Sequence, residues 1–310
     1  MKKTTVMSLL MITALAVSAC GANTDTTTET TEITTEAADT NNTDKPDGQP
    51  PQDGQGGPGG PGGEMGQPPE GGQGGQGGPG GNGAPGGFGG SGEVTQGTAA
   101  NTIDTDGTYT AETYTSTGDD ENALRVDGAE VTLTNITVDK ASGATSNTED
   151  GDFYGMNAAL LATDGANVTI TGAAVTSSAQ NGNGVFSYGE GTVVNISDST
   201  ITTTADNSGG IQTTGGGTTN ATNLTVKTSG NSSAAIRSDR GGGTVVVNKG
   251  TYESNGYNSP AVYSTADITV KNATLTANNS EALVIEGQNS ITLENCDVTG
   301  NMSDTQGSSS

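Results

Sequence analysis

The sequence predicts an all-β solenoid, a parallel β-helix of about seven coils, preceded by a long disordered tether. Three observations support this prediction: an eight-residue motif recurs seven times after residue 93, its copies are nearly evenly spaced, and residues 21–92 include few large apolar residues. Of the 310 residues, 51 are Gly, and nine of the ten Pro lie between Pro46 and Pro85. Such a density of Gly and Pro disfavours regular structure, so the two regions are organised differently.

The repeated motif reads apolar-x-apolar-x-(Asn, Gly, Asp or Lys)-x-x-apolar, and its third position is an anchor from which the spacing is measured. Successive anchors lie 37, 26, 25, 26, 23 and 23 residues apart. A step of 23–26 residues fits one coil of three short strands, and stacked coils bury equivalent apolar side chains against one another. A β-sandwich, the alternative, predicts frequent turns but no in-register repetition. The anchors are Leu133, Ile170, Ile196, Ala221, Val247, Val270 and Leu293.

Two further positions of the motif predict local geometry. The fifth position is mostly Asn or Gly, which tolerate the left-handed αL conformation at a turn, and stacked Asn amides can bond along the solenoid axis. The sixth position is small or apolar in every copy, so its side chains should point inward. Cys296 occupies it in the last copy and is expected to be a buried free thiol. The fifth positions are Asn135, Gly172, Asp198, Asn223, Lys249, Asn272 and Asn295.

The N-terminal 92 residues predict export and anchoring. Residues 1–20 combine two lysines, a short apolar run and a terminal Cys20, which is typical of a secretory signal and too short for a membrane span. The stretch Val17-Ser18-Ala19-Cys20 resembles the lipobox of bacterial lipoproteins, which implies diacylation of Cys20. Residues 21–92, first rich in Thr and Glu and then in Gly, Pro and Gln, predict a disordered tether to a domain spanning 93–310.

The end of the sequence carries an open question. The chain stops at SDTQGSSS shortly after a motif copy, without an obvious closing cap. Terminal repeats of a solenoid normally need a polar cap. Either the Ser-rich tail covers the last coil or the domain is truncated at its C-terminus.

The composition excludes several classes of function. Without His, the chain has no Ser-His-Asp or Cys-His nucleophile and no His-based zinc site. A net charge of -25 disfavours nucleic acid and anionic lipid headgroups as partners, because each phosphate contact needs a cation. We expect a monomer that binds no nucleic acid and reaches the membrane only through the lipid on Cys20.

The Thr/Asn-rich, Gly-punctuated repeat resembles the right-handed parallel β-helix superfamily of pectate-lyase-like proteins. Together with the lipobox and the Gly/Pro tether, it is similar to the lipid-anchored carbohydrate-binding or adhesin-like β-helix proteins of Gram-positive bacteria. This resemblance implies a right-handed solenoid displayed on the cell surface. It also implies that a lyase of this fold would use carboxylate-bound Ca²⁺ and an Arg or Lys base, for which Arg237 and Arg240 are the one suitable basic cluster.

A row of side chains on the first strand of each coil is the candidate ligand-binding face. The residue after each apolar anchor of that strand should point outward, one coil above the next. Gln212, Arg237 and Tyr263 would then be neighbours, and planar polar groups beside an aromatic ring suit a polysaccharide, with Arg237 suited to a uronic acid carboxylate. An ordinary wet surface row is the alternative. The aligned residues are Arg125, Ala162, Ser187, Gln212, Arg237 and Tyr263.

The long first step of 37 residues places an insertion near residues 142–155. This expected loop carries Glu149, Asp150 and Asp152 around a Gly, and closely spaced carboxylates can bind Ca²⁺. Asp119 or Asp120 would complete such a site. The alternative is a solvated acidic loop, since the segment lacks the full signature of a calcium loop.

The expected function is that of a non-catalytic, adhesin-like surface lipoprotein that binds extracellular or cell-wall polysaccharide. Calcium-dependent lyase activity on a polyuronate is the first alternative. A structural spacer or an adhesin directed at proteins is the second. Paired Thr residues, as in Thr132-Leu133-Thr134, also resemble ice-binding arrays, but other residues interrupt the rows and Thr is a common strand residue.

Overall fold

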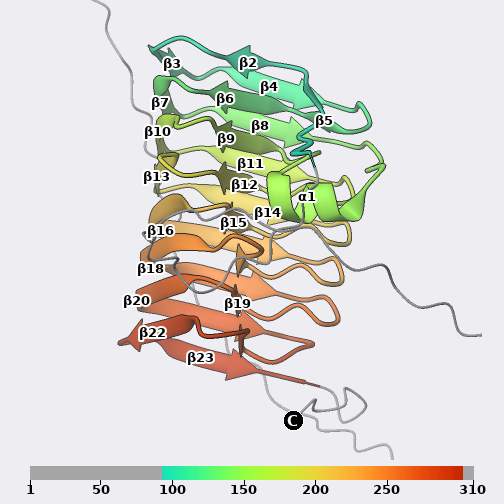
Figure 1. Ribbon diagram of the computed structural model, residues 1–310. Coiled ribbons are helices and arrows are strands. Elements are labelled where there is room, and N and C mark those ends of the chain that lie inside the picture. Colours follow the sequence, from blue (N-terminus) through green and yellow to red (C-terminus); the bar gives the residue numbers. More distant parts are fainter. Residues whose placement is uncertain (1–92, 303–310) are drawn as a thin grey trace, which may run out of the picture. The chain divides into compact units, whose positions relative to one another are not determined.

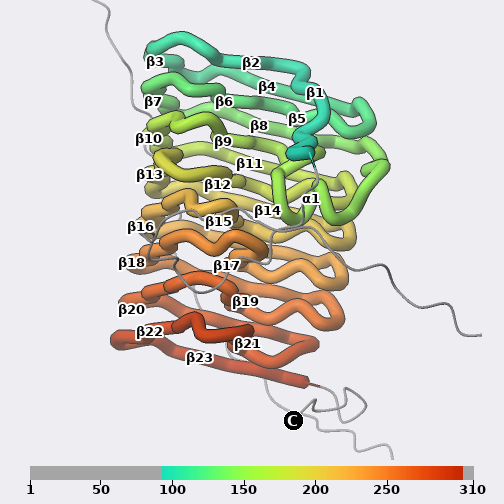
Figure 2. Tube along the Cα trace, in the orientation of Figure 1, coloured from blue at the N-terminus to red at the C-terminus, as the bar shows by residue number. Residues whose placement is uncertain are grey.

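Residues 93–302 wind into a parallel β-solenoid of eight coils in the computed structural model, which describes this part of the chain (Figure 1). The predicted signal peptide, the lipidation residue Cys20 and the tether lie outside the described residues. Successive coils stack directly on one another along the Cα trace (Figure 2). Within residues 93–302, no helix has the length and apolar character needed to cross a membrane.

One face of the solenoid is an eight-stranded parallel sheet with one short strand from each coil. Its central strands are buried at every position, because another layer covers their outer side. The strands are β2 (Thr102–Ile103), β6 (Leu124–Asp127), β9 (Leu160–Thr163), β12 (Val185–Tyr188), β15 (Ile211–Thr214), β17 (Ile236–Ser238), β19 (Val262–Ser264) and β21 (Leu283–Ile285).

The other two faces join into a 13-stranded parallel sheet. In three later coils a single long strand runs across both faces, whereas the other coils use two strands separated by a corner. The first of these faces holds β3 (Gly107–Thr110), β7 (Glu130–Thr134), β10 (Asn167–Thr171), β13 (Val193–Ser197) and β22 (Ser290–Glu294). The second holds β4 (Thr113–Ser116), β8 (Thr137–Lys140), β11 (Ala174–Ser177), β14 (Thr200–Thr203) and β23 (Asp297–Gly300). The long strands are β16 (Gly217–Thr228), β18 (Gly243–Ser254) and β20 (Asp267–Ala277); β1 (Thr98–Ala99) pairs separately with β5 (Glu121–Asn122).

The predicted anchors pair in register and form one column of the core. Leu133 pairs with Ile170, Ile170 with Ile196, and the column continues in the same way to Leu293. The first six anchors are at most 2% exposed. The alternation of apolar and polar residues therefore correctly predicted which side chains of these strands point into the core.

The prediction of seven coils is one coil short. The additional coil precedes the first predicted copy, and its Tyr109 pairs with the anchor Leu133. Its sequence from Gly107 has the shape of the motif, but Tyr109 and Tyr114 replace aliphatic residues, and Ala111 holds the corner with φ 56°. The pattern was missed because a Gly begins it and a non-Asn residue adopts the αL conformation.

The predicted αL corners are confirmed. The seven fifth-position residues all have positive φ, between 51° and 69°. Amide contacts along the axis link only some of them: the Asn223 side chain donates to Asp198 at 2.7 Å, and that of Asn295 donates to Asn272 at 3.4 Å. These corners fix the direction of the chain between the two faces of the larger sheet.

A buried ladder of serines stabilises the corner that precedes the strands of the eight-stranded sheet. The backbone N–H of Ser208 donates to Ser233 Oγ at 2.9 Å, and the N–H of Ser233 donates to Ser259 Oγ at 2.9 Å. Each of these hydroxyls also donates to a backbone carbonyl, as Ser259 does to Gly230 at 2.9 Å. All three serines are fully buried, so the ladder satisfies backbone groups that water cannot reach.

The insertion is a short helix rather than the expected loop. Helix α1 (Thr148–Tyr154) begins after Asn147, whose side chain accepts from Glu149 N–H, and ends at Gly155 with φ 81°. An Asn N-cap and a Gly in the αL conformation are the residues that favour those two boundaries. The helix packs against the eight-stranded sheet, where Asn181, Gln212 and Thr214 donate side-chain hydrogen bonds to its backbone carbonyls.

Cys296 is free but only half-buried, in contrast to the expected full burial. Its equivalents in earlier coils, such as Leu224 and Ala273, are at most 4% exposed. The difference arises because Cys296 belongs to the last described coil, where one side of each strand is unpaired. Val298 in the same coil is 40% exposed for the same reason.

The serine ladder makes a prediction about stability. Replacing Ser233 by Ala leaves the buried Ser208 N–H without an acceptor, which should lower the free energy of unfolding by about 1–3 kcal/mol. Ser229→Ala is the control, since Ser229 is exposed in the same coil and should change stability by less than about 0.5 kcal/mol. Equal midpoints of denaturation for the two variants would refute a structural role for the ladder.

Candidate ligand-binding site

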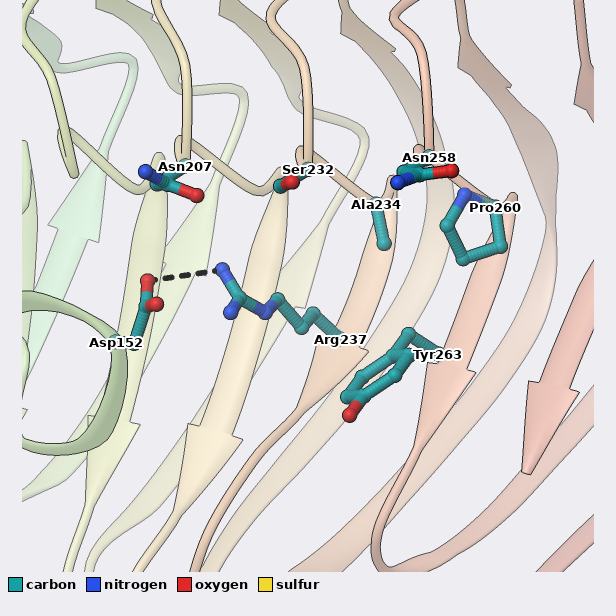
Figure 3. A pocket seen from close by; sticks show the side chains of 8 residues that line it. All are labelled: Asp152, Asn207, Ser232, Ala234, Arg237, Asn258, Pro260 and Tyr263. Atoms are coloured by element: carbon teal, nitrogen blue, oxygen red, sulfur yellow. Dashed lines mark hydrogen bonds and ion pairs between the residues drawn. The ribbon is translucent and has the colours of Figure 1, made fainter. Parts of the chain in front are cut away.

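A cavity of about 270 Å³ opens on the outer side of the eight-stranded sheet, beside helix α1 (Figure 3). Residues from three successive coils and from the helix line it. Figure 3 shows three corner residues along one rim and the Tyr263 ring beside the Arg237 side chain. The lining residues are Asp152, Asn207, Ser232, Ala234, Arg237, Asn258, Pro260 and Tyr263.

The rim of the cavity is built from one corner of each coil. Asn207, Ser232 and Asn258 each adopt the αL conformation four residues before a strand of the sheet begins, with φ values of 54°, 53° and 51°. Because the coils are in register, equivalent corners repeat at about 4.8 Å along the axis. The sequence therefore places a row of amide and hydroxyl groups at regular intervals above the strands.

Arg237 forms the centre of a buried ion-pair network. Its Nη1 lies 3.1 Å from Asp152 Oδ1, and its Nη2 lies 2.9 Å from Asp239 Oδ2. The three side chains are only 10–14% exposed. Asn181 Nδ2 donates to the same Asp152 oxygen at 2.9 Å. The network therefore joins helix α1 to β17, 85 residues later in the chain.

Burial and ion pairing have opposite effects on the pKa values in this network. Burial raises the pKa of the Asp152 carboxyl, an effect that the Arg237 charge and the Asn181 hydrogen bond offset only in part. Burial lowers the pKa of the Arg237 guanidinium, but its two carboxylate partners more than compensate and the pKa is raised. Arg237 is therefore a permanent cation, and each of its two terminal nitrogens donates to a carboxylate.

Tyr263 lies at the open side of the cavity. It is half-buried, and burial is the main reason why the pKa of its hydroxyl is raised, with the nearby Glu286 carboxylate adding to the effect. The hydroxyl therefore stays protonated at neutral pH and can donate a hydrogen bond. Its ring remains the aromatic surface of the cavity.

Gln212 is close to this site, but it is not a surface residue as the sequence suggested. It is fully buried beneath helix α1, and its Nε2 donates to the Asp152 carbonyl oxygen at 2.5 Å. It holds the helix in place instead of facing solvent. Of the row predicted from the sequence, only Arg237 and Tyr263 line the cavity.

The alignment that predicted this row is wrong by one residue in two coils. Leu161 and Phe186, not Ala162 and Ser187, are in register with Gln212. A slip of one residue moves a side chain to the other side of the sheet, and Ala162 and Ser187 are indeed buried inside the solenoid. Leu161 and Phe186 point outward but form a small apolar cluster with Ala158.

Arg125 does not belong to the site. It lies on β6, separated from β17 by three strands of the sheet. Its Nη2 donates to the carbonyl oxygens of Gln96 and Gly97 at 2.7 and 3.0 Å and to Asn122 Oδ1 at 2.8 Å. Its role is to fasten the segment before β1, which leaves it unavailable to a ligand on the outer face.

The carboxylates of the insertion do not converge on a metal position. Asp152 contacts Arg237, whereas Glu149 lies 3.8 Å from Arg240 on the exposed side of the helix. Asp119 and Asp120, the possible additional ligands, accept hydrogen bonds from backbone N–H groups. Within residues 93–302, no group of three His, Cys, Asp or Glu side chains is placed to hold a metal ion. This geometry gives no support to the calcium hypothesis.

No protein-family model matches this chain, and no curated protein or solved structure shows significant similarity to it. Any assignment of function therefore has to come from the residues of the site.

Sequence reasoning missed several residues of the cavity. Asn207 and Asn258 belong to a recognisable motif of Asn, small residues and an apolar residue, but the motif alone indicates a corner and not a ligand contact. Asp239 is two residues from Arg237, and an acidic residue so close to a predicted binding Arg was a usable signal. The partnership with Asp152 had no signal, because the helix docks through tertiary contacts.

The ion-pair network predicts unequal roles for two neighbouring arginines. Arg237→Ala leaves two buried carboxylates without their cation and should destabilise the docked helix by about 3–5 kcal/mol, exposing residues 142–156 to protease. Arg240→Ala should cost less than about 1 kcal/mol, since Arg240 and Glu149 are 60% and 69% exposed. Limited proteolysis with mass spectrometry measures both, and equal cleavage of the two variants would contradict the assignment.

Proposed function

We propose that this chain is a non-catalytic surface protein that binds a polysaccharide in the cavity beside helix α1. The observation that carries the proposal is the combination, in one open cavity, of an aromatic ring and a row of amide and hydroxyl groups from three successive coils. Sugars offer hydroxyl groups for hydrogen bonding and C–H faces for packing on an aromatic ring. A volume of about 270 Å³ suits one or two sugar residues, at the small end of ligand pockets.

The direction of the corner row supports a chain-like ligand. Asn207, Ser232 and Asn258 repeat along the solenoid axis, so a linear polymer lying along the axis can make equivalent contacts with each coil. The Asn207 and Asn258 amides each provide donors and an acceptor. Tyr263 would pack against one sugar ring while the corner groups bind the hydroxyls at its edge.

Binding without catalysis is favoured over the polyuronate lyase alternative. A lyase of this kind needs a free Arg or Lys to abstract a proton, and Arg237 is held between two carboxylates that raise its pKa. Arg240, the other candidate, contacts Glu149 and lies over the Phe153 ring at 4.2 Å. Neither arginine is placed as a base in the cavity.

A structural spacer or an adhesin directed at proteins is less well supported. A spacer requires only the stacked coils and gives no reason for a helix to be fastened beside a polar cavity by a buried ion pair. The core of a protein–protein interface is usually apolar and poor in charged residues, whereas this cavity is lined by Asp152, Arg237 and the polar corner row.

Removing the aromatic ring tests the proposal. Tyr263→Ala should weaken the binding of an oligosaccharide identified on a glycan array by tenfold or more, about 1.4 kcal/mol, as measured by calorimetry. Tyr257→Ala is the matched control, because Tyr257 is 45% exposed in the same coil but does not line the cavity. The absence of any glycan that binds saturably, or equal losses for the two variants, would refute the proposal.

A site that binds an extracellular polysaccharide must lie outside the cell. We therefore include lipid anchoring at Cys20 in the proposal. The support is the signal-like segment and the lipobox-like stretch in the sequence. Two acyl chains hold a protein on a membrane much more firmly than one.

Cys20→Ser should therefore release the protein from the membrane fraction into the medium of a bacterial host, and should abolish incorporation of labelled palmitate. Cys296→Ser is the control and should leave both readouts unchanged, since Cys296 lies in the last described coil. Retention of the label in Cys20→Ser would contradict the anchor.

A further inference from the structure

Aromatic side chains gather at the C-terminal end of helix α1, outside the cavity. Phe153 and Tyr154 are the last two residues of the helix, and Tyr188 is the last residue of β12. The Tyr154 and Tyr188 rings meet edge to face, with their centroids 5.6 Å apart and their planes at 84°. None of these three residues lines the cavity. We call the two tyrosine rings the aromatic platform.

The protein holds both tyrosines in place without using their hydroxyl groups. The carbonyl oxygen of Tyr154 accepts from Gln96 Nε2 at 3.0 Å, and Tyr188 packs against the buried cluster that contains Leu161 and Phe186. Both tyrosines are nevertheless only half-buried. Within residues 93–302, no hydrogen bond reaches either tyrosine hydroxyl. The platform therefore offers ring surface and two free hydroxyl groups to a ligand.

Phe153 is not part of this surface. The Arg240 guanidinium lies over its ring, 4.2 Å from the centroid, and also contacts Glu149. A cation in this position covers the ring face, to which it is attracted by the ring quadrupole. The neighbouring aromatic residue is thus already occupied by a protein group, in contrast to Tyr154 and Tyr188.

Open space lies beside the Tyr188 ring. Tyr188 is followed by the corner that contains Gly189, and the corner of the preceding coil contains Gly165. A Cβ atom at Gly165 or Gly189 would meet no atom of a non-adjacent residue within 4 Å. The two corners lie next to each other, since a Cβ atom at Gly191 would be 3.8 Å from Gly165 Cα. A ligand on the platform is therefore not obstructed from this side.

Hydrogen-bond acceptors border the same space. Asp164 directly precedes Gly165 and is exposed. Burial raises the pKa of the Tyr188 hydroxyl, and the neighbouring Tyr154 and Asp164 add to this rise, so the hydroxyl stays protonated and can donate. The Asp164 carboxyl shares a hydrogen bond with that of Asp127, and a carboxylate has further acceptor positions. An anionic sugar would face two carboxyl groups here, whereas the hydroxyl groups of a neutral sugar would donate to Asp164.

We infer that the aromatic platform is a second sugar-binding position, which takes a neutral sugar residue of a polysaccharide. The C–H face of the sugar packs on one tyrosine ring, and its hydroxyl groups bind Asp164 and the free tyrosine hydroxyls. Tyr188 on β12 and Tyr263 on β19 are three strands apart in the sheet, so the platform is separate from the cavity. This inference rests on the proposed function and adds a second position to it.

The test titrates the full chain with cellohexaose, xylohexaose, mannohexaose and hexagalacturonate while NMR follows the tyrosine ring signals. At least one neutral hexasaccharide should shift the Tyr154 and Tyr188 signals saturably, and hexagalacturonate should bind there at least about tenfold more weakly. These shifts should persist in Tyr263→Ala, which lacks the ring of the cavity. Shifts of Tyr263 alone would overturn the second position and leave the proposed function standing.

No shift at the platform with any neutral probe, or tighter binding of hexagalacturonate there, would also overturn the inference. Loss of both positions, with no ligand on a wider glycan array, would overturn the proposed function as well.

Removing one ring of the platform should weaken binding there. Tyr188→Ala should lower the affinity for the neutral hexasaccharide at the platform about tenfold or more. Tyr257→Ala is the control, since Tyr257 is 45% exposed but belongs to neither position, and should leave the affinity unchanged. Equal affinities of these two variants would contradict the assignment to the platform.

The Asp164 carboxylate can be removed without risk to the corner. Asp164 has φ 55°, and Asn tolerates the αL conformation as well as Asp does. Asp164→Asn should therefore weaken binding at the platform severalfold, because a charge-assisted hydrogen bond becomes a neutral one. Asp198→Asn is the matched control: Asp198 is exposed, has φ 51° and lies at a corner of the larger sheet. Equal losses in the two variants would attribute the effect to the net charge and overturn the role of Asp164.

Discussion

Successive coils pair in parallel and in register, and this pairing determines whether each side chain points into the core or away from it. Leu133, Ile170 and Ile196 are stacked in the core because their strands pair without a shift. The same pairing aligns polar residues in columns outside the core, and it brings equivalent corners together at each level. Because the side-chain period of a strand is two, a shift of one residue would exchange the interior and the surface of a whole coil.

The buried polar ladders follow from the same constraint. A corner that turns the chain inside a protein leaves backbone groups that water cannot reach. In three coils a serine at the same corner position accepts from the N–H of the preceding coil, as Ser233 does for Ser208. The corner leaves a buried backbone N–H in successive coils, and a Ser repeated at one position provides the acceptor for it. This repetition explains why the corners keep their shape while the outward positions vary.

The parts of the fold that repeat could be predicted from the sequence. The prediction was wrong where helix α1 covers the eight-stranded sheet. The apolar anchors and the αL corners were found because each is repeated in several coils. The outward row was misassigned at Leu161 and Phe186, where apolar residues follow the equally apolar Leu160 and Val185. Two consecutive apolar residues indicate that both sides of the strand are covered, but periodicity alone does not say which of them points inward. Asp152 of the covering helix α1 lies 85 residues before Arg237, so their partnership had no local signal.

The position of the cavity follows from the length of the insertion. The row on the outer face runs from Leu161 through Gln212 and Arg237 to Tyr263. Helix α1 buries its first members completely, contacts Arg237 at its edge, and leaves Tyr263 half-exposed. The cavity therefore lies at the boundary between the covered and uncovered parts of one face. An ion pair is suited to that boundary, because a helix edge that meets both protein and solvent can bury a charge only with a partner. A longer helix would cover Tyr263, and without the helix the cavity would lose the wall that Asp152 provides.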